Sequence, residues 1–259
     1  MSRGTRSMPV PAPHGLWTPG RATGPDVRRS GPNDRAALAD RSDRVYRPQA
    51  DTLLLMEALG ELPLRGARAL DLCTGSGVVA VEAASRGARV TAIDSSPAAA
   101  RAARAVSSGA GVEVDVLQVG VAEFRCTRGF DVITCNPPYV PTPVGTEDVP
   151  GAGAGPAEAW NAGTDGRAVL DVVCARLDEL LSPTGTALIV QSAFADCDQT
   201  LAVVREAGLS AHVARRRAIP FGPVLLARCE QLRRAAVIPP DCHDEEIVVI
   251  RAHRPGGAR

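Results

Sequence analysis

The stretch Asn136-Pro137-Pro138-Tyr139 carries the most specific chemistry in the sequence. Proline has no N–H group, so a backbone with two consecutive prolines offers only carbonyl oxygens to a ligand. The side-chain oxygen of Asn136 and the carbonyl oxygen of Pro137 then form a pair of acceptors, which suits the two hydrogens of a planar NH2 group. Tyr139 adds a flat face for stacking. We therefore predict that residues 136–139 bind and orient a planar nitrogen.

A glycine-rich stretch, Asp71-Leu72-Cys73-Thr74-Gly75-Ser76-Gly77, lies upstream. Residues 75–80 also match the dinucleotide fingerprint G-x-G-x-x-[G/A], so the glycines alone do not choose between ligands. In either case they let the backbone turn sharply and approach a ligand at a helix N-terminus. The Asp71 carboxylate would repel a pyrophosphate, but it suits a ligand with an amino group and a sulfonium, such as S-adenosylmethionine. The two stretches together predict methyl transfer to a planar nitrogen.

Asp94 ends the next predicted strand, where a carboxylate can accept hydrogen bonds from two ribose hydroxyls. This role fits NAD and S-adenosylmethionine equally, so Asp94 predicts a nucleoside cofactor without choosing one. The alternative is that Asp94 caps the helix that begins at Pro97.

Short apolar strands alternate with helix-like stretches over most of the chain. This alternation predicts an α/β fold: a Rossmann-like, seven-stranded, mostly parallel sheet with helices on both faces and an antiparallel C-terminal strand. The predicted strands are 69–73, 89–93, 112–116, 130–135, 186–191, 211–218 and 246–251, and the predicted helices are 77–85, 97–107, 166–181 and 198–207. An irregular stretch is predicted between the last two strands, and a loop over the carboxyl edge of the sheet at 140–156.

The first 40 residues differ in composition from the rest of the chain. Residues 1–40 are rich in Pro, Gly and Arg with almost no apolar periodicity, which predicts a disordered tail. Residues 41–259 are predicted to form one catalytic domain. It opens with a helix that ends near Gly60, for which Asp51 or Thr52 is the predicted cap.

The composition restricts the partners and the cellular compartment that can be expected for the protein. The net charge is zero, so the whole-chain field gives no reason to expect strong adhesion to nucleic acid or to anionic membranes. Seven cysteines without a C-x-x-C pair predict reduced thiols in a cytoplasmic protein. No apolar run approaches the roughly 20 residues that span a bilayer. Residues 241–244 (Asp-Cys-His-Asp) lack spaced partners, so no metal site is predicted.

Taken together, these motifs resemble the HemK family of class I S-adenosylmethionine-dependent methyltransferases. The resemblance runs through residues 46–52 (Tyr-Arg-Pro-Gln-Ala-Asp-Thr), 71–77, Asp94, 136–139 and 160–167 (Trp-Asn-Ala-Gly-Thr-Asp-Gly-Arg), and covers almost everything after the tail. The short form, similar to the eukaryotic and archaeal release-factor methyltransferases, fits best because no separate helical domain precedes the catalytic one. Such enzymes methylate the side-chain amide of the glutamine in a Gly-Gly-Gln motif, and an activating subunit is a possible partner.

The resemblance implies a role for each matching position. The substrate clamp would be Asn136, Pro137, Pro138 and Tyr139, acting while the target nitrogen attacks the sulfonium methyl in line. The implied cofactor contacts are Thr52, Asp71, Cys73, Thr74, Gly75, Ser76, Gly77, Asp94, Ser95 and Asn136.

Two positions depart from the family pattern. The family often has an acidic residue after the third strand that contacts the adenine, but residues 118–121 (Gln-Val-Gly-Val) contain none. Adenine recognition is then expected from the backbone and apolar groups of 119–121. The glutamate that usually precedes the proline of the entry segment is Arg47 here, which alters the charge expected to face the target peptide.

Other functions stay open at this point. An N-methyltransferase acting on the exocyclic amine of adenine in DNA or RNA would use the same clamp, because that amine presents the same two hydrogens. A small-molecule N-methyltransferase is a further alternative. An NAD-dependent oxidoreductase would explain the glycines but not residues 136–139, and a non-catalytic binding module would have to retain both motifs without using them.

Overall fold

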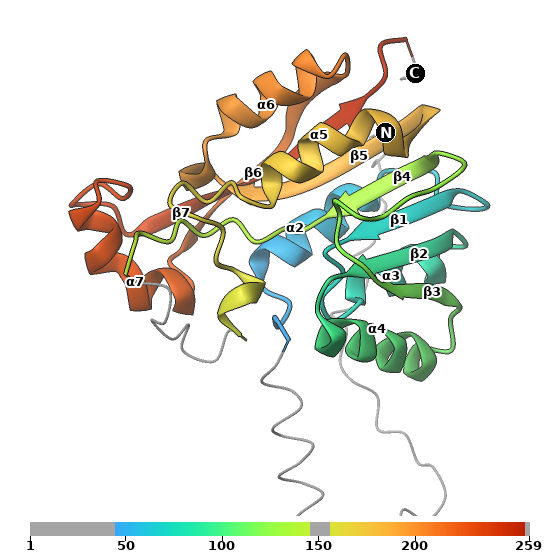
Figure 1. The fold of residues 1–259 in the computed structure, drawn as a ribbon, viewed down its shortest axis with the longest axis horizontal. Helices are drawn as coiled ribbons and strands as arrows, with labels where there is room; N and C mark the ends of the chain where they lie inside the picture. Colours follow the sequence, from blue (N-terminus) through green and yellow to red (C-terminus); the bar gives the residue numbers. More distant parts are fainter. Residues whose placement is uncertain (1–44, 146–155, 257–259) are drawn as a thin grey trace, which may run out of the picture.

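A computed structural model describes residues 45–145 and 156–256 and centres on a twisted sheet (Figure 1). The strand order is β3-β2-β1-β4-β5-β7-β6, and β7 runs antiparallel to both of its neighbours while the other pairs are parallel. This confirms the predicted fold class. The strands are β1 (Arg68–Leu72), β2 (Arg89–Asp94), β3 (Val114–Gln118), β4 (Phe130–Cys135), β5 (Leu181–Ser192), β6 (Ser210–Pro220) and β7 (Asp244–His253).

Helices cover both faces of the sheet, as Figure 1 shows. One face packs against α2 (Ala50–Leu59), α3 (Val78–Ser85) and α4 (Pro97–Ala110), and the other against α5 (Leu170–Leu180) and α6 (Cys197–Glu206). Neighbouring residues of β5 alternate between the two cores, with Ile189 in one and Leu188 and Val190 in the other. Because successive side chains of a strand point to opposite faces, a strand covered on both sides reads as continuously apolar.

The site lies where the chain reverses its direction of winding. From β1 the sheet extends through β2 to β3 on one side, and through β4 to β5 on the other. In open α/β sheets the connections then leave the carboxyl ends of the two central strands in opposite directions, which opens a crevice between them. The glycine-rich stretch follows β1 and residues 136–139 follow β4, so the topology brings both motifs to this crevice.

The structure corrects three predictions of local structure. The connection between β6 and β7 contains a helix, α7 (Pro223–Arg234), where an irregular stretch was predicted. The helix predicted over 166–181 begins only at Leu170, because Gly166 has φ +78° and belongs to a turn. Neither Asp51 nor Thr52 caps α2, since Gln49 occupies the cap position. The predicted tail at 1–40 and most of the predicted loop at 140–156 lie outside the described residues.

Gly77 shows how the glycine-rich stretch is packed. It precedes α3 with φ +83°, and a Cβ atom there would lie 2.8 Å from both Cα and Cβ of Ala103 on α4. A side chain therefore has no room, and the backbone conformation favours glycine. Gly77 does not line the cavity described below. Its structural role is the close approach of α3 to α4, whereas the family resemblance implied a cofactor contact.

We expect Gly77→Ala to lower the free energy of unfolding by about 1–3 kcal/mol, because the added methyl overpacks the helix contact in a strained conformation. Gly109→Ala is the matched control, since Gly109 is helical and a Cβ atom there would meet no atom within 4 Å. It should raise stability by about 0.5 kcal/mol. Urea titration of both variants checks the pair, and equal effects would contradict the packing argument.

Candidate active site

A cavity of about 700 Å³ lies at the carboxyl ends of β1, β2 and β4. It brings together the predicted site residues of both motifs, with the exception of Gly77. The predicted residues in its wall are Thr52, Asp71, Cys73, Thr74, Gly75, Ser76, Asp94, Ser95, Asn136, Pro137, Pro138 and Tyr139. Most of the wall is apolar, and its few charged groups are carboxylates, which is typical of a site that orients a ligand with a small number of polar contacts.

Asp71 lies on β1 beside the glycine-rich stretch and is 3% exposed. Its carboxylate accepts hydrogen bonds from Thr74 Oγ1 at 2.5 Å and from Thr134 Oγ1 at 2.6 Å. Burial nevertheless raises the pKa of Asp71 to about 6, because the two hydroxyls only partly replace water. A buried carboxylate with neutral partners favours a cationic ligand, which would restore its charged form.

Asp94 is the last residue of β2, and its carboxylate connects the glycine-rich stretch to the residues that precede α4. Its Oδ2 accepts from the backbone N–H of Gly75, and its Oδ1 from that of Ser96, each at 2.9 Å. Burial raises the pKa of Asp94, and these two backbone bonds oppose the shift. The cap of α4 is Ser96, whose Oγ accepts from Ala99 N. The alternative role of Asp94 as that cap is therefore wrong.

Asn136 is held in one orientation by two neighbours from the start of α2. Its Nδ2 donates to Asp51 Oδ2 at 3.1 Å and lies 3.3 Å from Thr52 Oγ1. A carboxylate only accepts hydrogen bonds, so the amide must turn its nitrogen toward Asp51. Within the described residues no hydrogen bond uses Asn136 Oδ1. The oxygen is thus available as the acceptor that the sequence predicted.

Asp51 is a residue of the cavity wall that the sequence did not indicate as part of the site. It is 3% exposed, and its Oδ2 also accepts from the hydroxyls of Tyr46 at 2.9 Å and Tyr139 at 2.8 Å. Its Oδ1 accepts from the backbone N–H and the hydroxyl of Thr52. An aspartate before an apolar helix is typical of a cap, so the local pattern concealed this role. The signal available was that both tyrosines of the chain fall in the two motifs that meet here.

The two tyrosines remain hydrogen-bond donors. Burial, and then the charge of Asp51, raise the pKa of Tyr46 and of Tyr139 well above the usual range of a phenol. Both hydroxyls therefore stay protonated at physiological pH. Tyr139 lines the cavity beside the double proline, and its predicted role in stacking stays a prediction.

Trp160 and residues of α7 also line the cavity. Trp160 is 3% exposed, lines the cavity and packs with Val224 and Leu225 of α7. The guanidinium of Arg228, also on α7, lies 4.3 Å from the centre of the Trp160 ring. The indole N–H of Trp160 is buried without a hydrogen-bond partner among the described residues. The helix missed by the sequence analysis is thus part of the site's wall.

Comparison with known proteins agrees with this geometry. A family model described as "Conserved hypothetical protein 95" matches residues 38–146. The human protein named Methyltransferase HEMK2 is 30% identical over 195 residues, which cover 71% of this chain and 86% of the human protein. The chain belongs to the HemK family of methyltransferases. It is therefore an enzyme of the methyltransferase class.

Other HemK-family members differ in length. A release factor glutamine methyltransferase of Mycolicibacterium smegmatis is 37% identical over 136 residues, and these cover 51% of this chain but only 47% of that protein. Among solved structures, Mtq2 in the E. cuniculi Mtq2–Trm112 complex superposes with a TM-score of 0.55 at 21% identity, covering 81% of this chain and 98% of that one. The structural likeness supports the fold.

The cavity wall also contains an acidic residue, Glu123, close in sequence to residues 119–121. Val119, Gly120 and Val121 line the cavity as expected, and Glu123 lines it too. Glu123 folds back over Gly120, because its Oε2 occupies the space that a Cβ of Gly120 would take. Residues 118–121 contain no carboxylate, and the turn that returns Glu123 to the cavity wall is not visible in the local sequence pattern.

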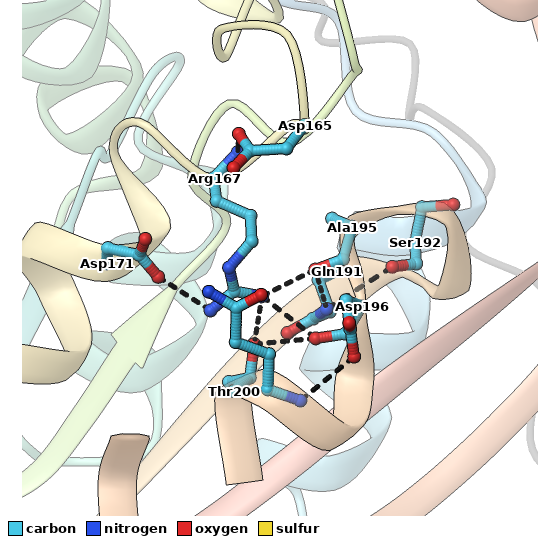
Figure 2. Close-up of polar contacts among 9 residues, drawn as sticks. Asp165, Arg167, Asp171, Gln191, Ser192, Ala195, Asp196 and Thr200 are labelled. Atoms are coloured by element: carbon cyan, nitrogen blue, oxygen red, sulfur yellow. Dashed lines mark hydrogen bonds and ion pairs between the residues drawn. The ribbon is translucent and has the colours of Figure 1, made fainter. Parts of the chain in front are cut away.

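Arg167 closes the segment 160–167 against the body of the protein (Figure 2). Its side chain is 1% exposed. Nη1 donates to Ala195 O, Asp196 O and Thr200 Oγ1, at 2.5, 2.8 and 2.9 Å, and Nη2 pairs with Asp171 at 2.6 Å. The planar guanidinium thus joins α5 to the turn before α6, and it holds the segment whose other end carries Trp160.

The segment also touches the residues that follow β4. Val140 and Thr142 exchange backbone hydrogen bonds with Trp160, Ala162 and Gly163. A Cβ atom at Gly166 would lie 2.5 Å from the carbonyl oxygen of Tyr139. The glycine therefore permits a close approach of the segment to the predicted clamp.

Two absences concern only residues 45–145 and 156–256. That part of the chain contains no group of three or more His, Cys, Asp or Glu side chains that could hold a metal ion. It also contains no helix long and apolar enough to cross a membrane.

We expect Arg167→Ala to lower the free energy of unfolding by about 3 kcal/mol, because two carbonyls and a hydroxyl each lose one buried donor and Asp171 loses its ion pair. Arg234→Ala is the matched control: its ion pair with Glu230 is 75% and 74% exposed, so the change should stay below about 0.5 kcal/mol. Thermal and urea unfolding measure both. A loss of similar size in the two variants would show that Arg167 does not hold the segment.

Proposed function

We propose that this enzyme uses S-adenosylmethionine to methylate the side-chain amide nitrogen of a glutamine in a protein, such as a translation release factor. The observation that carries the proposal is the fixed amide of Asn136, whose nitrogen is bound by Asp51 and whose oxygen is left for an incoming N–H. Relatives named as release factor glutamine methyltransferases support the choice of acceptor. The catalytic domain is proposed to extend over residues 41–259.

The residues at the carboxyl ends of β1 and β2 fit S-adenosylmethionine. Asp71 is a buried carboxylate with only neutral partners, which suits the amino group of the methionine part. Asp94 and Glu123 both line the cavity; Asp94 would accept hydrogen bonds from the ribose hydroxyls, and Glu123 would hold the adenine. Cys73, Thr74, Gly75, Ser76 and Ser95 complete this wall, and Thr52 lies between it and the clamp. When bound, S-adenosylmethionine supplies a methyl group on a positively charged sulfur.

The clamp acts on the acceptor nitrogen. An amide nitrogen is a poor nucleophile because its lone pair is delocalised, so orientation matters more than mere binding. Asn136 Oδ1 and the Pro137 carbonyl oxygen accept the two N–H bonds and direct the lone pair toward the methyl, while Tyr139 stacks on the planar amide. As positive charge develops on the nitrogen, both acceptors bind it more strongly, which stabilises the transition state over the ground state.

Transfer of labelled methyl tests the function. The substrates are a purified release factor with its Gly-Gly-Gln loop, its Gln→Ala counterpart, and a mixed DNA and RNA pool. We expect label on the intact factor alone. Label on the nucleic acid would move the acceptor to adenine. If nothing is labelled, the assay is repeated with a small partner subunit of the kind present in the Mtq2–Trm112 complex, and continued silence would reject a protein glutamine as the acceptor.

We expect Asn136→Ala to lower turnover by on the order of a hundredfold or more, with nearly normal cofactor affinity, because it removes an acceptor that acts on the substrate nitrogen. Asp94→Ala is the complementary variant. It should weaken S-adenosylmethionine binding by about tenfold, which corresponds to one lost hydrogen-bonding carboxylate. Calorimetry measures the affinity and labelled transfer the rate. Unchanged turnover in Asn136→Ala would contradict the proposal that Asn136 orients the acceptor nitrogen.

Asp71 makes cofactor binding depend on pH. Burial raises its pKa to about 6, and a bound ammonium group favours the charged carboxylate. The site must therefore release a proton when the cofactor binds below pH 6, and affinity should rise as the pH is raised from about 5 to about 7. Calorimetry in buffers of different ionisation enthalpy detects the proton. Affinity independent of pH in this range would argue against Asp71 as the partner of the amino group.

A further inference from the structure

Glu245, near the start of β7, is a second buried carboxylate at the acceptor end of the cavity. It is 6% exposed and lines the cavity together with Asp51 and Tyr46. The next residue, Glu246, points to the other side of the strand and pairs with Arg216 at 2.6 Å. Among the described residues, neither Glu245 nor Asp51 forms an ion pair with an arginine. A buried carboxylate without a cation is costly, so its place in a ligand cavity needs a reason.

The groups around Glu245 are neutral or negative. The hydroxyl of Ser192, at the end of β5, donates toward it, and Asp51 faces it from α2. The remaining titratable neighbours are the phenols of Tyr46, before α2, and Tyr139, after β4, which stay protonated. Burial, and to a smaller extent Asp51, raise the pKa of Glu245 to about 7, and the Ser192 hydroxyl opposes the shift. Glu245 can therefore gain or lose a proton near neutral pH.

Asp51 is a poor proton acceptor although it lies closer to Asn136. Its two oxygens accept five hydrogen bonds: from the hydroxyls of Tyr46, Tyr139 and Thr52, from the amide of Asn136, and from the backbone N–H of Thr52. An ionised carboxylate offers about four lone-pair sites, so Asp51 has no capacity left for a substrate proton. Glu245 has no comparable set of donors among the described residues.

The reaction produces a proton that must leave this end of the cavity. The lone pair of the acceptor nitrogen forms the new C–N bond while the S–CH3 bond breaks, and its electron pair stays on sulfur as S-adenosylhomocysteine forms. The nitrogen then carries a positive charge and one proton too many. This balance is the same for an amide and for an amine that attacks in its neutral form.

We propose that Glu245 accepts the proton that the acceptor nitrogen loses on methylation, directly or through one water. This role rests on the proposed methyl transfer to nitrogen, but not on glutamine being the acceptor. Solvent takes the proton from Glu245 when the product leaves. In this scheme Asn136 orients the acceptor nitrogen, and Glu245 removes its proton.

The variant Glu245→Gln keeps the size of the side chain and removes the proton acceptor. In the wild type we expect kcat to fall as the pH is lowered through about 7, because protonated Glu245 cannot accept. The variant should lose on the order of a hundredfold in kcat, a usual contribution of general base catalysis, and should also lose this acidic limb. S-adenosylmethionine affinity should be unchanged. If Glu245 had only a structural role, Glu245→Gln would lower kcat but would keep the acidic limb of the pH profile.

Two further variants control the experiment. Ser192→Ala removes the donor that lowers the pKa of Glu245, so it should move the acidic limb to higher pH. Glu246→Gln alters the adjacent carboxylate, which faces Arg216, and should leave both the rate and the limb unchanged. If Glu245→Gln retains the wild-type rate, or keeps the acidic limb, the proposal is wrong.

A readout without any acceptor separates this proposal from the proposed function. If Glu245 has its raised pKa in the folded protein, the folded state binds more protons than the unfolded one between about pH 4.5 and about pH 7. The free energy of unfolding of the wild type should then fall, relative to Glu245→Gln, as the pH rises through this window. If the difference in free energy of unfolding between the two proteins does not change with pH, the proposal for Glu245 is wrong even if release factor is methylated. If the only negative result is that release factor is not labelled, only the choice of acceptor is wrong.

Discussion

The hydrogen bonds to the Asp51 carboxylate are the interaction on which the acceptor end of the cavity depends. They join three parts of the chain: the entry segment through Tyr46, the first turn of α2, and the residues after β4 through Asn136 and Tyr139. Neutral donors, rather than an arginine, satisfy the charge, so the carboxylate keeps its oxygens fixed without bringing a cation near the substrate. One buried group thus sets the direction of the Asn136 amide, which we propose binds the acceptor nitrogen.

The fold and the meeting of Asp71, Gly75 and Asp94 at one cavity were predictable because their signals are local. Apolar runs indicated the central strands, and all three residues were expected at or just after strand ends. Asp51 and Glu245 were not found, because burial is a tertiary property. Asp51 stands where a helix cap is common, and Glu245 lies in an acidic run that reads as solvent-exposed until β6 and α2 cover it.

The two ends of the cavity are built differently. The cofactor end consists of strand ends and the turn before α3, which the sheet holds rigidly. The acceptor end is assembled from segments far apart in sequence. Trp160 and residues of α7 line it. Arg167 anchors the segment that begins at Trp160 (Figure 2). Such a division lets a fixed cofactor site serve acceptors that are selected by connections of variable sequence.

The electrostatics of the cavity limit what it can accept. Although the chain has no net charge, its cavity gathers the carboxylates of Asp71, Asp94, Glu123, Asp51 and Glu245. A cationic cofactor lowers the cost of this arrangement, and a neutral amide adds no charge that would raise it. A phosphate brought near these carboxylates would be repelled, so a nucleotide acceptor must present its base while its backbone stays outside. The same carboxylates that favour the sulfonium therefore favour a side chain on a peptide over a base on a polyanion.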